Sequence, residues 1–167
     1  VIKEGRNYVS DGRSHILDFQ AGSVAMGMNG SEIVMAKPGG VRVKAKVAAL
    51  LDGSPDTAIR GLRVDEKPFW HIERARLGAS RKVPVELIVN GEPMARREIE
   101  ADGSIQEVVF DAQIDRSSWI ALRILPSSHT NPVWVTVGGK PVRERRSIEW
   151  ALDAVDRCYR QKIGRIR

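Results

Sequence analysis

The sequence predicts a mainly β fold: an antiparallel β-sandwich of immunoglobulin-like or jelly-roll-like type, followed by a C-terminal amphipathic helix. Most of the chain consists of short segments in which apolar residues recur at every second position, the period of a strand with one buried face. Gly, Asn and Asp dipeptides typical of tight turns separate these segments. Near the C-terminus, apolar residues recur instead at spacings of three and four, the period of a helix.

The clearest predicted strands are residues 41–47 and 83–89. Asn90-Gly91 follows the second of them and predicts a hairpin, because both residues tolerate positive φ. Asp102-Gly103 predicts the next turn, so that residues 83–89, 94–100 and 105–110 form a meander. The remaining predicted strands cover residues 15–20, 23–26, 32–36, 118–125 and 133–137, with Asn29-Gly30 joining the second and third of these. The absence of strand–helix alternation argues against a parallel α/β sheet.

Two stretches have a weaker pattern. Residues 68–77 are expected to be extended, and residues 51–67 form the longest irregular stretch, with Gly53-Ser54-Pro55-Asp56 inside it. A loop of this length is long enough to have a functional role.

Residues 147–163 are predicted to form the C-terminal helix, with Ser147 as its N-terminal cap and Gly164 as its stop. Its apolar stripe consists of Ile148, Ala151, Leu152, Val155, Cys158 and Tyr159. We expect this stripe to pack on the sandwich or on a neighbouring domain, with Trp150 at one edge of it. Cys158, the single cysteine, is then expected to be a small buried hydrophobic residue, and it leaves the cellular compartment open.

The composition, with 42% hydrophobic and 29% charged residues in 167, is that of a globular protein with its own core. No apolar run reaches the roughly 18 residues of a membrane span. The net charge is +6, and both a solvated basic face and a surface for an anionic partner account for it. Aromatic residues are few and are not interleaved with basic ones, which argues against a nucleic-acid partner. The basic residues concentrate near the C-terminus at Arg143, Arg145, Arg146, Arg157, Arg160, Lys162, Arg165 and Arg167.

Two clusters contain residue types that bind metal ions. His15 follows Asp11 in a predicted turn, and His71 shares a face of a predicted extended segment with Glu73. Imidazole and carboxylate groups are metal ligands, so His15, His71 and Glu73 are candidates. The structural alternatives are a turn stabilised by an Asp or Ser side chain and a cross-strand polar pair.

The third histidine, His129, lies in a loop bracketed by Pro126 and Pro132. Ser128 precedes it, but adjacent residues direct their side chains apart, and no acidic partner is near in sequence. The sequence therefore favours a structural loop that lines an interdomain site over a Ser–His nucleophile.

Tryptophans in predicted strands are candidate contacts for a ligand. Trp70, Trp119 and Trp134 lie in such segments. An exposed tryptophan on a sheet face can stack on a sugar ring, whereas a strand tryptophan can equally pack in a core or at an edge. Trp70 and Trp134, together with His129, are the residues that we single out for binding.

Several segments, taken in order, resemble a known family. They are residues 5–15 (GRNYVSDGRSH), 70–76 (WHIERAR), 85–91 (VELIVNG), 116–124 (RSSWIALRI), 126–133 (PSSHTNPV) and 147–150 (SIEW). Their order and spacing resemble the C-terminal portion of PHP-type (polymerase and histidinol phosphatase) metal-dependent hydrolases of the CehA/McbA type. The resemblance covers essentially the whole chain.

The resemblance implies a domain organisation. In that family a TIM-like barrel carries the metals, and a β-sandwich follows it. Residues 1–14 would be a remnant that closes the preceding barrel, residues 15–142 the sandwich, and residues 143–167 a helix packed on it. The family's metal motifs, His-x-His and a late Asp-x-His, are both absent from the sequence, so no catalytic residue or metal ligand is carried over.

The function implied by the resemblance is that of a non-catalytic accessory domain. It would pack on the catalytic barrel, shape the substrate entrance and contribute to contacts between copies of the chain. The divalent metal would belong to the parent hydrolase, and this chain alone would hold no cofactor and have no hydrolase activity. The alternative is a ligand-binding module, which would bind glycans through exposed tryptophans or polyanions through the Arg-rich C-terminal end.

Overall fold

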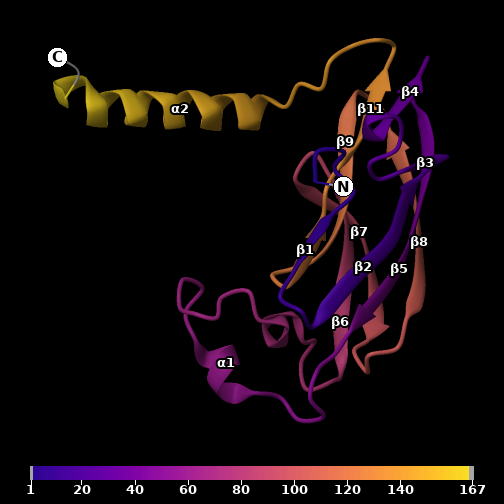
Figure 1. The fold of residues 1–167 in the computed structure, drawn as a ribbon, viewed down its shortest axis with the longest axis vertical. Helices are drawn as coiled ribbons and strands as arrows, with labels where there is room; N and C mark the ends of the chain where they lie inside the picture. The colour runs from indigo at the N-terminus through magenta and orange to yellow at the C-terminus, as the bar shows by residue number, and fades with distance from the viewer. Residues whose placement is uncertain (1, 166–167) are drawn as a thin grey trace.

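The protein has two β-sheets that share one apolar core, and a helix at its C-terminal end (Figure 1). This is a computed structural model that describes residues 2–165. The mainly β class and the C-terminal helix predicted from the sequence are confirmed. Val1, Arg167 and the side chain of Arg165, which belong to the predicted terminal segments, lie outside the described part of the chain.

The strands are short, as the spacing of the turn residues predicts. They are β1 (Tyr8–Ser10), β2 (Ser14–Ala21), β3 (Val24–Ala25), β4 (Glu32–Met35), β5 (Gly39–Ala49), β6 (Lys82–Val89), β7 (Glu92–Glu100), β8 (Gln106–Ile114), β9 (Ser118–Ile124), β10 (Ser128–Thr130) and β11 (Val133–Val137). The helices are α1 (Thr57–Gly61), α2 (Arg145–Lys162) and the 3-10 turns η1 (Asn29–Ser31), η2 (Ile72–Ala75) and η3 (Ile163–Arg165).

Sheet A contains β1, β4, β6, β7, β9, β10 and β11, and sheet B has the order β3-β2-β5-β8. All pairings are antiparallel except that of β4 with β11, which is parallel. The sequence-based expectation of a purely antiparallel sandwich is therefore wrong at this edge. The predicted hairpin through Asn29-Gly30 is also wrong, because β3 belongs to sheet B and β4 to sheet A. A strand that arrives from the other sheet is not constrained by a hairpin and can run parallel to its neighbour.

The two other predicted turns form, but only one joins strands of the same sheet. Asn90 and Gly91 have φ values of 51° and 91° and connect β6 to β7 as predicted. Asp102-Gly103 instead carries the chain from β7 in sheet A to β8 in sheet B, so the three strands do not form a meander. Hydrogen bonds from the hydroxyl and the backbone N–H of Ser104 hold the pKa of the Asp102 carboxyl below its ordinary value.

The core lies between the two sheets and draws side chains from both. In β5, Val41, Val43, Ala45 and Val47 are buried, while the alternate residues are exposed. Phe110 of β8 and Leu122 of β9 are among the largest fully buried side chains, and they come from opposite sheets. Burial of this apolar surface is the main stabilising contribution to the fold.

The segment before residue 14 is part of this fold. β1 pairs with β10, and Val9 lies opposite His129 in their register. The predicted loop between Pro126 and Pro132 therefore contains a strand. The Asp11 carboxylate accepts a hydrogen bond from the backbone N–H of Ile72 at 2.9 Å. The boundary expected at residue 14 does not coincide with a break in the sheets.

The segment between β5 and β6 is more ordered than its sequence predicts. It contains α1 and η2, so the extended conformation expected for residues 68–77 is wrong. The reason is local capping: Asp56 accepts a hydrogen bond from the backbone N–H of Ile59 at 3.0 Å, and His71 Nδ1 accepts one from that of Glu73 at 3.1 Å.

Helix α2 exists as predicted but begins earlier, at Arg145. Its N-terminal cap is Glu144, which makes no side-chain capping hydrogen bond, and Ser147 lies inside the first turn. The expected Ser147 cap is therefore wrong. An ion pair between Arg145 and Glu149, 2.7 Å long and four residues apart, stabilises this turn instead.

The packing of α2 differs most from the prediction. Figure 1 shows the helix projecting away from the sheets, and none of its described side chains is buried. The expected packing on the sandwich is therefore wrong, and Cys158 is exposed rather than buried. The physical reason is that each sheet already covers the inner face of the other, which leaves no apolar inner surface for a helix.

We predict that Phe110→Ala lowers the free energy of unfolding by about 3–5 kcal/mol, because it leaves a cavity between the sheets. Ile105→Ala is the matched control, since Ile105 is 63% exposed, and we expect it to cost less than about 0.5 kcal/mol. Urea denaturation of both variants checks this. Equal losses would contradict the shared core.

Candidate functional site

The metal-ligand candidates from the sequence are engaged in local contacts. His15 Nδ1 is 2.8 Å from the hydroxyl of Tyr8. His71 caps η2, and Glu73 is buried in an ion pair with Arg76. Among residues 2–165, no group of three or more His, Cys, Asp or Glu side chains is placed to hold a metal ion.

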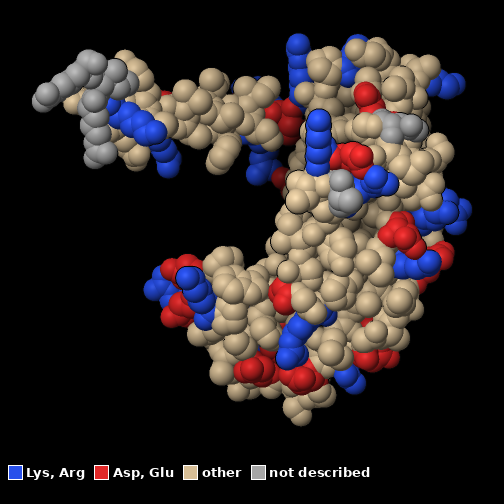
Figure 2. All heavy atoms as spheres, viewed as in Figure 1, with Lys and Arg blue, Asp and Glu red and all other residues tan. Residues whose placement is uncertain are grey.

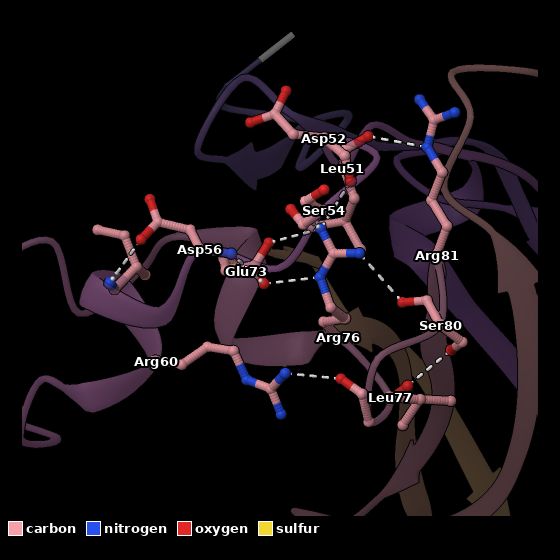
Figure 3. A network of polar contacts seen from close by, with 12 residues as sticks. Leu51, Asp52, Ser54, Asp56, Arg60, Glu73, Arg76, Leu77, Ser80 and Arg81 are labelled. Atoms are coloured by element: carbon pink, nitrogen blue, oxygen red, sulfur yellow. Dashed lines mark hydrogen bonds and ion pairs between the residues drawn. The ribbon is translucent and has the colours of Figure 1, made fainter.

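The buried ion pair of Glu73 and Arg76 organises the segment between β5 and β6 (Figure 3). Arg76 Nε and Nη2 donate to the two Glu73 carboxylate oxygens at 2.6 and 2.8 Å. The guanidinium also donates to the carbonyl oxygens of Asp52 at 2.7 Å and Ser80 at 3.1 Å. Because these carbonyls lie at the two ends of the segment, one side chain closes the loop at its base.

Further contacts fix the arm formed by this segment. Glu73 Oε1 accepts a hydrogen bond from the backbone N–H of Asp56 at 3.1 Å, next to α1. Arg60 of α1 donates to the Gly78 carbonyl at 2.6 Å, and Arg81 donates to the Leu51 carbonyl at 2.9 Å. We call residues 52–81 the loop arm. These hydrogen bonds predict that the loop arm is a rigid projection from the sheets.

The loop arm presents aromatic side chains. Phe69 and Trp70 pack edge to face with ring centroids 4.6 Å apart, and both are partly exposed. Trp70 therefore lies in a loop and not in a strand as predicted. Such an amphipathic aromatic pair at a projecting position is typical of protein contact surfaces.

The outer face of sheet A lies between the loop arm and α2 (Figure 1). The strand registers place Val9, His129, Arg123 and Glu86 in one row across β1, β10, β9 and β6. Residues opposite one another in a ladder direct their side chains to the same face. Arg123 and Glu86 neutralise each other at 2.7 Å, while Val9 is 57% exposed. His129 is exposed in this row, so its side chain is available on the outer face.

A second row on the same face contains two tryptophans. Trp134 of β11 lies opposite Trp119 of β9, and Trp134 is 42% exposed. The structure therefore brings two of the predicted binding residues, His129 and Trp134, to one face. It gives Trp134 a neighbour, Trp119, on that face.

Helix α2 forms the second projection beside this face. Its exposed apolar stripe consists of Ile148, Leu152, Val155 and Tyr159, and Ile163 of η3, which is also exposed, follows it. Two ion pairs hold its root to the sheets: Arg116–Glu144 at 2.7 Å and Arg146–Glu92 at 2.5 Å. Such exposed pairs contribute little stability. Their main effect is to set the direction in which the helix leaves the sheets.

Trp150 lies on the other side of α2 from the apolar stripe. It is two residues after Ile148, which places it about 200° around the helix axis. It lines a groove of about 690 Å3 together with Met94 and Gly91 at the root of the helix. The expectation that Trp150 borders the stripe is therefore wrong.

Figure 2 shows the surface between α2 and the loop arm as a hollow with few charged side chains. Its floor is the outer face of sheet A, and its two sides are the loop arm and α2. We call this surface the hollow face. Exposed apolar residues such as Val9 and Trp134 on such a surface are typical of a protein interaction site.

No protein-family model and no curated protein matches this sequence. None of the helices within the described residues combines the length and the hydropathy that crossing a membrane requires. The site is therefore defined by its geometry.

Some residues of the hollow face were not singled out from the sequence. Val9 and Phe69 had no signal, because an isolated apolar residue is uninformative before its neighbours are known. Arg76, which is buried at the base of the loop arm, did have a signal, since a Glu and an Arg three residues apart can form a short-range ion pair.

We predict that Arg76→Met lowers the free energy of unfolding by about 3–5 kcal/mol, because it leaves the Glu73 carboxylate buried without a partner. Arg63→Met is the matched control in the same segment, since its ion pair with Asp65 is exposed, and it should cost less than about 1 kcal/mol. Urea denaturation measures both, and hydrogen exchange should be faster across the loop arm in the Arg76 variant. Equal losses would contradict the proposed role of this ion pair.

Proposed function

We propose that this chain is a non-catalytic accessory domain whose hollow face docks on the catalytic barrel of a PHP-like metal-dependent hydrolase and shapes its substrate entrance. The observation that carries this proposal is the exposure of helix α2. It is an amphipathic helix of 18 residues without a buried side chain.

The energetics of such a helix favour a partner. An isolated helix of about this length is marginally stable in water, and none of the described side chains of α2 is buried. Leu152 and Val155 are 65% and 67% exposed at the centre of the stripe. Burying each such side chain is worth roughly 1.5–3 kcal/mol, so docking would stabilise the helix and the complex together.

The chemistry of a barrel surface fits this partner. The outer layer of a TIM-like barrel consists of helices, and ridges of one helix pack into grooves of another. The apolar stripe of α2 on one side and the Phe69–Trp70 pair on the other can contact the helices of a barrel. The barrel surface would then lie against the outer face of sheet A. The order of the segments that resemble the PHP-type family supports a barrel that precedes this chain.

In this proposal the divalent metal and the reacting groups belong to the barrel. Within residues 2–165, the candidate ligands make other contacts, which supports this proposal: His71 and Glu73 are engaged in the loop arm, and His15 bonds to Tyr8. We also propose that the two sheets form a sandwich of immunoglobulin-like or jelly-roll-like type, which the crossings between sheets support.

A second candidate function is glycan binding, which the pairing of Trp134 with Trp119 on an open sheet face favours. Aromatic faces on a sheet can stack on sugar rings. If this candidate holds, Trp134→Ala will abolish binding to a glycan array, and Leu152→Asp will leave it unchanged. The polyanion version of this module has less support, because Arg145 and Arg160 of α2 already pair with Glu149 and Asp156.

The docking proposal predicts a change in thiol reactivity. Cys158 is exposed at the edge of the apolar stripe, so its alkylation in the isolated chain should be fast. In the longer protein that includes the barrel, we expect alkylation at least ten times slower, because the stripe is covered. Leu152→Asp with Val155→Asp should restore fast alkylation there, whereas Ile105→Asp, at the turn between β7 and β8, should not. Equal rates in the isolated chain and the longer protein would contradict docking through α2.

The proposal also predicts that the isolated chain hydrolyses no phosphoester, amide or carbamate with added zinc or manganese. Assays with chromogenic substrates of these three classes test this. Metal-dependent turnover that His15→Ala or His71→Ala abolishes would overturn the non-catalytic assignment.

A further inference from the structure

We propose that a groove beside the root of α2 binds a small, non-aromatic molecule that carries phosphate groups. The groove has a volume of about 660 Å3 and lies outside the hollow face, between the segment after β4, the turn between β8 and β9, and the linker to α2. Its charged lining residues are Lys37, Arg116, Lys140, Arg143 and Asp115. This inference does not depend on the docking proposal.

The groove carries an excess of positive charge, with Asp115 as the acidic residue among its lining side chains. Arg116 is neutralised by Glu144 at 2.7 Å. Within residues 2–165, no acidic side chain forms an ion pair with Lys37, Lys140 or Arg143. These three cations come from separate segments of the chain and line one concave surface, where fields of the same sign add.

The groove is held in shape by hydrogen bonds at its floor. The Ser117 hydroxyl donates to the Lys140 carbonyl at 2.5 Å and accepts from the backbone N–H of Val137 at 2.8 Å. The backbone N–H of Gly138 donates to the Met35 carbonyl at 2.8 Å. These contacts tie the linker to the ends of β4 and β11, so the backbone beneath the cations is ordered before any ligand binds. Such preorganisation lowers the entropic cost of binding.

The donor set fits a phosphate group, which offers several oxygens and more than one negative charge. The guanidinium of Arg143 can bind two phosphate oxygens in a bidentate manner, and the ammonium groups of Lys37 and Lys140 supply two further charges. None of the described lining residues is aromatic, so the groove offers no stacking surface for a base. Pro38 and Pro141 form part of its wall and limit its shape. The volume is in the usual range for small-molecule sites.

The test is calorimetric titration of the chain with inorganic pyrophosphate. We expect saturable binding that Lys140→Gln with Arg143→Gln weakens at least tenfold. The matched control is Lys44→Gln with Lys46→Gln, which removes the same charge from the outer face of sheet B, where Asp18 and Glu107 lie beside the two lysines. The control variant should bind as the unmodified chain does.

Two outcomes would overturn this site. One is the absence of saturable binding up to millimolar pyrophosphate in the unmodified chain. The other is equal weakening in both double variants, which would indicate attraction to net charge alone. Thermal unfolding of each variant verifies that the fold is retained. Because all four substituted side chains are exposed, we expect their unfolding temperatures to remain close to that of the unmodified chain.

Discussion

The burial of two sheet faces against one another determines the rest of this structure. The inner faces of sheets A and B pack against each other, from Val43 on one side to Leu122 on the other. The loop arm adds only Ile72 and Ala75 of η2 to this core, and α2 adds no residue to it. The rest of the loop arm and all of α2 project from the side of sheet A, and the hollow face lies between them (Figure 1).

The two projections are stabilised in different ways. The loop arm has its own internal support, because the buried Glu73–Arg76 ion pair and its bonds to backbone carbonyls fix the arm at its base. Helix α2 has only short-range ion pairs and two exposed pairs at its root. One side of the hollow face is therefore preformed, and the other depends on what covers it.

Local patterns predicted the elements well, because they depend on neighbouring residues alone. The alternation in residues 41–47 and the turn at Asn90-Gly91 are examples, and both form as expected. The choice of sheet could not be predicted, since the same Asp-Gly turn can join strands within a sheet or between sheets. The exposure of α2 could not be predicted from the sequence either. An amphipathic stripe indicates that a helix has a partner, but it does not show where that partner lies.

The candidate site was predicted least well, because it is a property of the surface. His129 and Trp134 were found from residue type, but their position on one face depends on the pairing of β9 with β10 and β11. If the docking proposal holds, the hollow face, α2 included, is covered in the working protein. Hydrogen–deuterium exchange of residues 148–162 tests this when the isolated chain is compared with the longer, barrel-containing protein that the proposal assumes. We predict exchange within seconds in the isolated chain and strong protection in the longer protein, whereas identical exchange in both would rule out docking through α2.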